Sequence, residues 1–99
     1  MDKNIQQKEQ DGNGMFYIEK DGDIVAELTY KKMDNGVITL DHTETEPEME
    51  GKGLASALVK HSVEFARKND LKIDPLCAYA AKQFERHEDY RDVRVQEEK

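Results

Sequence analysis

The segment Gly51-Lys52-Gly53-Leu54-Ala55-Ser56-Ala57-Leu58 separates two hydrophobic periodicities in this chain. Before it, apolar and polar residues alternate at every second position, which is typical of strands. After it, the apolar residues of 53–69 fall on one half of a helical wheel and most charged residues on the other. This change of period predicts an α+β fold, with strands first and an amphipathic helix beginning at two glycines.

Three strands are predicted before the glycines, over residues 15–19, 24–31 and 37–43. The dipeptides Asp21-Gly22 and Asn35-Gly36 separate them, and both suit the positive φ angles of tight hairpin turns. The three strands are therefore expected to form an antiparallel meander.

A fourth predicted strand, residues 71–73, follows the long helix and ends at Asp74-Pro75. Because a whole helix separates it from the third strand, the two are expected to run parallel in a right-handed unit. Residues 78–87 are helical in composition, so the expected order is β-β-β-α-β-α. Residues 1–14 are expected to form a flexible polar tail, residues 15–95 a single domain, and residues 88–99 a fraying end.

The composition excludes several classes of function. The 99 residues carry 15 Lys and Arg against 22 Asp and Glu, a formal charge of −7, which argues against nucleic-acid or anionic-membrane partners. The chain shows no apolar run of membrane-spanning length and no signal-peptide pattern at its start. A single cysteine permits no internal disulfide, so we expect a cytoplasmic protein.

The two glycines before the helix permit two interpretations. Glycine lets the backbone approach a ligand closely, and the first N–H groups of a helix have no partner within it, so the turn suits a phosphate or pyrophosphate. Alternatively, Gly51 and Gly53 belong to an ordinary strand-to-helix turn. Glutamates at positions 46, 48 and 50 stabilise a helix start, and they oppose a phosphate unless they point away from it.

Residues 51–58 resemble the acyl-CoA-binding motif of the GNAT N-acetyltransferase superfamily. Three further segments resemble one branch of it, the minimal GNAT-like proteins of about this chain's length: His42-Thr43-Glu44-Thr45, Pro75-Leu76-Cys77-Ala78-Tyr79 and Arg86-His87-Glu88-Asp89-Tyr90. The resemblance covers residues 15–93. It implies a GNAT-like fold with a parallel, splayed strand pair, and transfer of an acetyl group from acetyl-CoA to an amine.

The resemblance also implies a set of CoA-binding residues. The strand before the loop pairs through its backbone with the pantetheine arm, and the glycine loop holds the pyrophosphate. The implied residues are Thr43, Thr45, Glu50, Gly51, Lys52, Gly53, Leu54, Ala55 and Lys82. Glu48 stands where the family has Gln or Arg, and Glu50 where relatives often have a basic residue, so weaker CoA binding is expected. Lys82 is either a phosphate contact or an exposed helix lysine.

Four residues are candidates for catalysis. Cys77 is either a small buried hydrophobe or a thiol activated at a helix start. The resemblance implies that this thiol lies near the CoA thioester, where it either accepts the acetyl group or only lines the cleft. His42, expected on the apolar face of the third strand, is either a core histidine or the general base. Glu44, on the same face, is expected to orient it. Tyr79 resembles the hydroxyl that protonates the leaving CoA thiolate in many relatives, although packing explains it equally.

The predicted function is therefore an acetyl-CoA-dependent N-acetyltransferase acting on a small amine or on a lysine or N-terminus of a protein. The alternative is a CoA-binding sensor or interaction module without catalysis, and a third option is an interaction domain that binds no CoA. A monomer or weak dimer is expected. No metal is expected, because the spacing of His42, His61 and His87 matches no metal motif.

Overall fold

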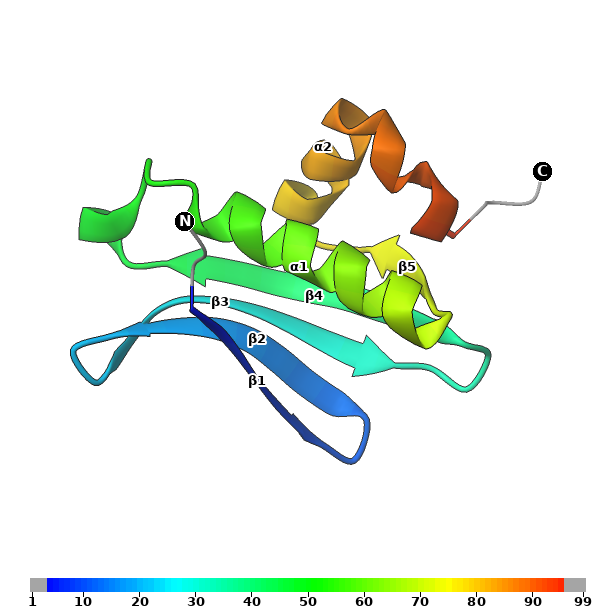
Figure 1. Ribbon diagram of the computed structural model, residues 1–99, viewed down its shortest axis with the longest axis horizontal. Helices are drawn as coiled ribbons and strands as arrows, with labels where there is room; N and C mark the ends of the chain where they lie inside the picture. Colours follow the sequence, from blue (N-terminus) through cyan, green and yellow to red (C-terminus); the bar gives the residue numbers. More distant parts are fainter. Residues whose placement is uncertain (1–3, 96–99) are drawn as a thin grey trace.

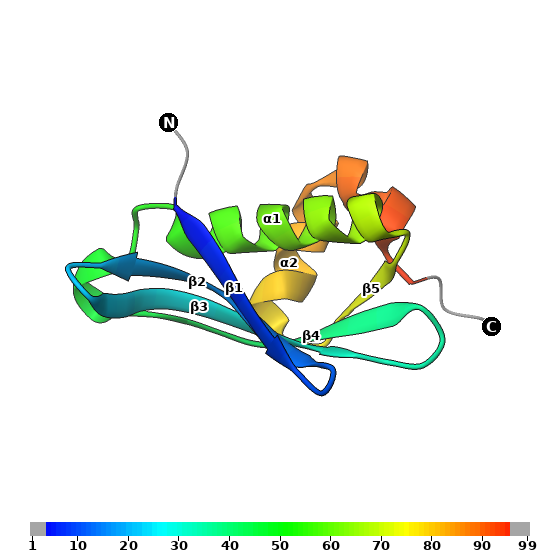
Figure 2. The same cartoon turned by 60° about the horizontal axis from the view of Figure 1, so that its bottom comes forward.

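The computed structural model describes residues 4–95, which form a five-stranded mixed sheet in the order β1-β2-β3-β4-β5 (Figure 1). Helix α1 lies across one face of the sheet, and α2 lies beside α1 near β5 (Figure 2). The strands are β1 Ile5–Gln10, β2 Asn13–Lys20, β3 Asp23–Lys32, β4 Val37–Thr45 and β5 Lys72–Pro75. The helices are α1 Leu54–Asn69 and α2 Ala78–Arg86, with short 3-10 helices η1 Pro47–Met49 and η2 Glu88–Val93.

The core lies between α1 and the sheet. The apolar stripe of α1 is buried, as its periodicity predicted, and it packs against the alternate residues of β2, β3 and β4 that face it. The largest fully buried apolar side chains of this core are Phe16, Leu28, Tyr30, Ile38, Leu40, Leu58, Val59, Val63 and Ile73. None of the helices in the described part of the chain is both long and apolar enough to cross a membrane.

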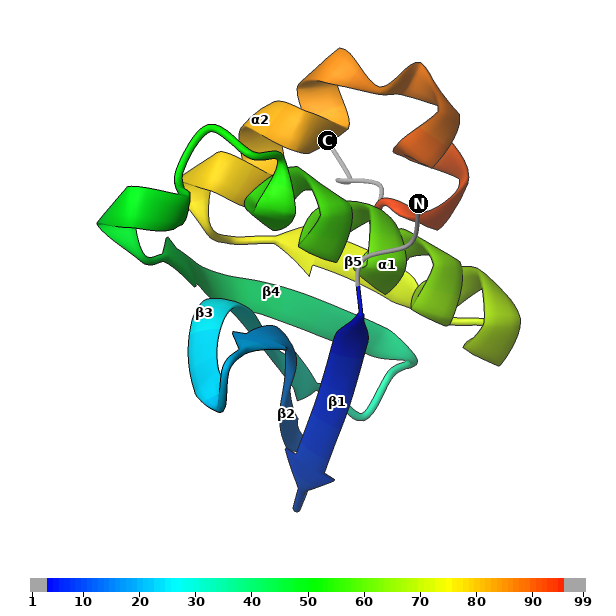
Figure 3. The same ribbon diagram turned by 60° about the vertical axis from the view of Figure 1, so that its left-hand side comes forward.

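The predicted parallel strand pair is confirmed, and it is short. β5 pairs with β4 only from Val37 to Leu40. β4 then continues to Thr45, whereas the chain after β5 turns into α2, so the two segments diverge (Figure 3). The backbone N–H groups of Leu76 and Cys77 both donate to the Leu40 carbonyl oxygen, at 3.1 and 2.9 Å. The α+β fold with an antiparallel meander and a splayed parallel pair is therefore present.

The structure differs from the expectation of a flexible tail over residues 1–14. β1 and β2 form an antiparallel hairpin around Asp11-Gly12, which adds a strand at the edge of the meander. The side chains of β1 are mostly exposed and only Ile5 packs against the core, so this edge strand shows no apolar alternation. Residues 1–3 lie outside the described residues.

A second difference concerns residues 88–99, which were expected to fray. Residues 88–93 form η2, where Tyr90 and Val93 are buried. Arg67 on α1 binds the Asp92 carboxylate through two nitrogens, at 3.0 and 2.8 Å, which fastens η2 to the long helix. Residues 96–99 lie outside the described residues.

The Tyr30 side chain joins β1 to the core. Its hydroxyl donates to Glu9 at 2.6 Å and accepts from Gln7 at 2.7 Å. Burial, with the hydrogen bond to Glu9, raises the pKa of Tyr30 to about 12, so the phenol stays protonated at neutral pH. The ring reaches β1 by crossing Gly14, where a Cβ atom would lie only 2.4 Å from Tyr30 Cζ.

We expect Gly14→Ala to lower the free energy of unfolding by about 2 kcal/mol, because the methyl group would displace a buried ring. Urea denaturation followed by circular dichroism measures this loss. In a Tyr30→Leu background, the same substitution should cost much less. Equal costs in the two backgrounds would contradict the proposed clash.

Candidate active site

A β-bulge in β4 sets the orientation of the candidate residues. Thr29 of β3 pairs with His42 and Tyr30 pairs with Leu40, so Asp41 is an extra residue in the strand. Ile38 and Leu40 face the core, but the extra residue breaks the alternation that would have continued to His42. The prediction that His42 lies on the apolar face is therefore wrong: its side chain is 58% exposed.

His42 and Glu44 form an exposed pair on β4. The imidazole Nε2 lies 3.3 Å from Glu44 Oε1. Glu27 of β3 stands directly across from Glu44, and one ligand atom from each of the three side chains lies within 4.8 Å of the others. Glu27 was missed from sequence because the bulge hides which residue of β3 faces Glu44. In residues 4–95, this trio is the one group of His, Cys, Asp and Glu side chains close enough together to hold a metal ion.

Cys77 lies at the point where β4 and β5 separate. It is the N-cap residue of α2 and is partly buried, with Sγ 3.5 Å from Thr43 Oγ1. Burial raises the pKa of the Cys77 thiol, but the Thr43 hydroxyl and the backbone at the start of α2 lower it further, and the net shift is downward. The backbone groups at Tyr79 and Ala80 account for the part of this lowering of the pKa that α2 contributes.

The glycine loop adopts backbone conformations that favour glycine. Gly51 has φ +83°, and Gly53, the N-cap residue of α1, has φ +79°. A Cβ at Gly51 would meet nothing within 4 Å, and one at Gly53 would meet only Ser56 Oγ at 3.8 Å. The loop backbone is therefore open to a ligand, and neither glycine is needed to relieve crowding.

A cleft of about 450 Å³ connects this loop with β4 and α2. It contains most of the predicted CoA-binding residues and two of the predicted catalytic residues, Glu44 from β4 and Tyr79 from α2. It also contains Met49, which the sequence analysis did not identify. The lining residues are Thr43, Glu44, Thr45, Met49, Glu50, Gly51, Gly53, Leu54, Ala55 and Tyr79. Cys77 does not line the cleft itself, but its Sγ contacts Thr43, which does.

Four predicted residues do not line this cleft: Cys77, His42, Lys52 and Lys82. Lys52 lines a different hollow beside the β2–β3 hairpin, as does Glu48. Lys82 is exposed on α2, and His42 contacts the cleft residue Glu44 without lining the cleft itself. Glu48 and Glu50 both depart from the family pattern, and of the two only Glu50 lines the cleft, where its carboxylate opposes an anion.

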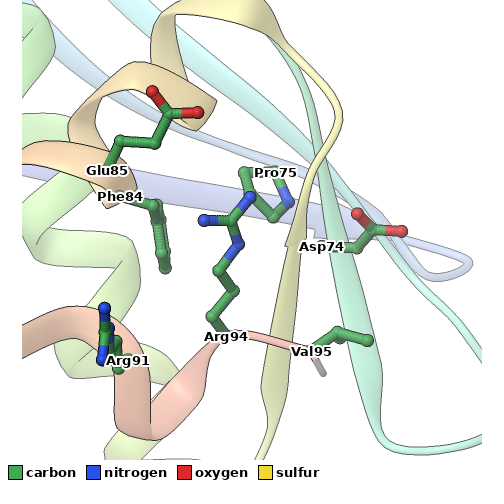
Figure 4. Close-up of a pocket in the computed structure, with 7 residues that line it drawn as sticks. All are labelled: Asp74, Pro75, Phe84, Glu85, Arg91, Arg94 and Val95. Atoms are coloured by element: carbon green, nitrogen blue, oxygen red, sulfur yellow. The ribbon is translucent and has the colours of Figure 1, made fainter. Parts of the chain in front are cut away.

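A larger cavity, of about 580 Å³, lies on the other side of α2 (Figure 4). The Arg94 side chain extends between Phe84 and Pro75, with its guanidinium carbon 6.0 Å from the Phe84 ring centre, and the Asp74 carboxylate points away from it. None of its lining residues is a candidate for catalysis or CoA binding. The smaller cleft is therefore the better candidate site.

Comparison with known families identifies residues 15–93 as matching the family described as GCN5-related N-acetyl-transferase. A comparison with curated proteins gives no match.

Solved structures give the same fold. The solution structure of a Staphylococcus aureus protein, described as GCN5-like and as a candidate N-acetyltransferase, is 36% identical with a TM-score of 0.72, covering 96% of this chain and 92% of that one. A ribosomal-protein-alanine N-acetyltransferase from Brucella melitensis is 15% identical with a TM-score of 0.68, covering 91% and 67% of the two chains. The ribosomal-protein-S18-alanine N-acetyltransferase from Escherichia coli is 18% identical with a TM-score of 0.64, covering 79% and 53%. The last two, at their low identities, support the fold alone.

We expect iodoacetamide to alkylate Cys77 with a pH midpoint below that of an ordinary thiol, because its pKa is lowered. Thr43→Val removes a group that stabilises the thiolate, so the pKa should rise and the rate at pH 7 should fall by about threefold. Thr45→Val is the matched control, since Thr45 lines the same cleft and no hydrogen bond joins it to the sulfur. Identical pH profiles for the two variants would show that Thr43 does not control the thiol.

Proposed function

Because the chain belongs to the GCN5-related N-acetyltransferase family, we propose that it transfers an acetyl group from acetyl-CoA to an amine in the cleft between β4, the glycine loop and α2. The observation that carries this proposal is the early end of the β4–β5 pairing at Leu40. It leaves the backbone of residues 41–45 with no β5 partner on that edge, beside a helix N-terminus and a cysteine with a lowered pKa.

The site fits an acyl-CoA through backbone groups. The unpaired edge of β4 offers N–H and C=O groups that suit the amides of an extended pantetheine arm. The left-handed turns at Gly51 and Gly53 present N–H groups at the start of α1, which suit a pyrophosphate. Acetyl-CoA supplies the activated acetyl group as a thioester. Glu50 lowers the affinity, since its carboxylate lines the same cleft.

Cys77 is proposed as the nucleophile. Its thiolate attacks the thioester carbonyl carbon, the bond from that carbon to the CoA sulfur breaks, and acetyl-cysteine forms. The Tyr79 hydroxyl, which lines the cleft, donates a proton to the departing CoA thiolate. The amine then attacks the acetyl-cysteine carbonyl carbon, and the Cys77 thiolate leaves.

His42 is proposed as the base for the amine. The imidazole takes the proton that the amine loses, and the Glu44 carboxylate at 3.3 Å holds the ring and stabilises its protonated form. The exposed position of the pair implies that the acceptor approaches from the sheet face opposite α1. Protein amines are within the reach of this fold, because two structural neighbours are named for acetylating an alanine of ribosomal proteins.

A CoA-binding module without catalysis is the second candidate function. Glu50 in the cleft is the observation that favours it, because an enzyme that turns over rapidly gains nothing from a carboxylate near the pyrophosphate. The Pro-x-Cys-x-Tyr segment favours the enzyme and supports membership of the minimal GNAT-like branch. We place the protein in the cytoplasm as a monomer or weak dimer, as expected from its single cysteine and its size.

We expect wild-type protein incubated with acetyl-CoA to gain the mass of one acetyl group, and Cys77→Ser to gain none. Intact-protein mass spectrometry measures both, with CoA alone as the control. Amine acetylation by Cys77→Ser at the wild-type rate would instead establish direct transfer. CoA binding with neither adduct nor acetylated amine would favour the binding module.

We expect Gly53→Asn to raise the Kd for CoA by roughly tenfold, because a side chain would enter the space in front of the loop N–H groups. Gly36→Asn is the matched control, since Gly36 has the same φ of +79° in the turn before β4 and does not line the cleft. Asparagine tolerates this backbone conformation, so both variants should fold. Isothermal titration with CoA compares them, and an unchanged Kd for Gly53→Asn would exclude the loop as the phosphate site.

A further inference from the structure

Glu27 is a half-buried carboxylate of β3 that has no role in the mechanism given above. Within residues 4–95, no lysine or arginine forms an ion pair with it. Glutamate is seldom withdrawn from water without a compensating charge. Its position therefore needs a reason other than packing.

The residue directly opposite Glu27 carries the same charge. Glu27 pairs with Glu44 of β4, and like charges at directly opposite positions of two strands are destabilising. No lysine or arginine of the described chain forms an ion pair with Glu44 either. Local conflicts of this kind are typical of functional sites, where stability is not the only requirement.

The His42 ring lies beside both carboxylates. One ring nitrogen of His42 and one oxygen from each of Glu27 and Glu44 all lie within 4.8 Å of one another. Glu44 approaches the ring along β4, and Glu27 approaches it from the neighbouring strand. The carboxylate of Asp41, the residue before His42, instead accepts a hydrogen bond from Thr39 at 2.9 Å. Two carboxylates from two strands therefore surround one imidazole.

The geometry also indicates which ring nitrogen acts as the base. Nε2 of His42 lies 3.3 Å from Glu44 Oε1, and an ionised carboxylate only accepts hydrogen bonds. The neutral ring therefore carries its proton at Nε2, and the lone pair that takes a proton from the amine is at Nδ1. The imidazolium that forms is attracted by both nearby carboxylates.

We propose that Glu27 is a positioning residue for the acetyl transfer and acts through His42, an inference that rests on the proposed function. Glu44 holds the ring along β4, and Glu27 holds it from β3. When the amine loses its proton to Nδ1, its nitrogen bonds to the acetyl carbon and the carbon–sulfur bond to Cys77 breaks. The new positive charge on the ring relieves the repulsion between the two carboxylates, so the pair favours this proton transfer.

Stability measurements separate this role from a packing role. Glu27→Gln keeps the size of the side chain and removes the repulsion, so it should raise the urea midpoint of unfolding at pH 8, where histidine side chains are uncharged. A packing role predicts a lower midpoint. A midpoint below that of the wild-type protein would overturn the proposal.

Kinetic measurements test the role in acetyl transfer, with n-butylamine as the acceptor probe and EDTA present so that no metal ion bridges the three side chains. Glu27→Gln should lower kcat about fivefold, the equivalent of one charge contact at the protein surface. The KM for acetyl-CoA should stay the same, because Glu27 does not line the cleft. Glu27→Asp keeps the charge and should retain part of the lost rate. Glu85→Gln is the matched control, since it makes the same change of charge outside the cleft and outside the His42 group.

A double-variant cycle tests whether Glu27 acts through His42. In a His42→Gln background, Glu27→Gln should produce no further loss of kcat. The same fivefold loss in that background, or equal kcat values for Glu27→Gln and Glu85→Gln, would overturn the proposal and leave the proposed function standing. A wild-type protein that transfers no acetyl group to the amine would remove the proposed function, and this role of Glu27 with it.

Discussion

The carbonyl oxygen of Leu40 is the point on which the candidate site depends. It accepts hydrogen bonds from both Leu76 and Cys77, so the parallel ladder ends there. The chain then leaves the sheet and enters α2, with Cys77 as its N-cap residue. Without this early end, β5 would occupy the backbone groups of residues 41–45 and close the cleft. The splay, the thiol and the free strand edge are therefore consequences of one pair of hydrogen bonds.

The bulge at Asp41 divides the second half of β4 between two faces. Thr43 contacts Cys77 and lines the cleft near α1, whereas His42 and Glu44 form their pair on the exposed side. Glu44 also lines the cleft, so this residue borders both the cleft and the exposed side of the strand. An acyl donor on one face and an amine on the other would thus meet across a single strand.

The sequence predicts the fold where hydrophobic period and turn chemistry agree. Local pattern predicts the apolar stripe of α1 and the turns at Asp21-Gly22 and Asn35-Gly36. Chain connectivity predicts the parallel direction of β5. The sequence does not predict which face of the sheet His42 lies on, or that Glu27 lies close to His42 and Glu44. A β-bulge shifts the alternation of side chains between the two faces and leaves no signature in the sequence. The Asp11-Gly12 turn carried the same signal as the other hairpin turns, but no apolar alternation preceded it.

The polar composition that hides β1 from pattern analysis has a further consequence for the molecule. β1 is the outer strand of the sheet, and an outer strand exposes a row of backbone groups to which another chain can add. Here that row is short, and its side chains include Lys8 and Glu9, the latter paired with Lys32 at 3.1 Å. An apolar alternating strand at this position would present a template for sheet extension from one molecule to the next. The same residues that make β1 unremarkable as a sequence thus protect the sheet against self-association at its edge.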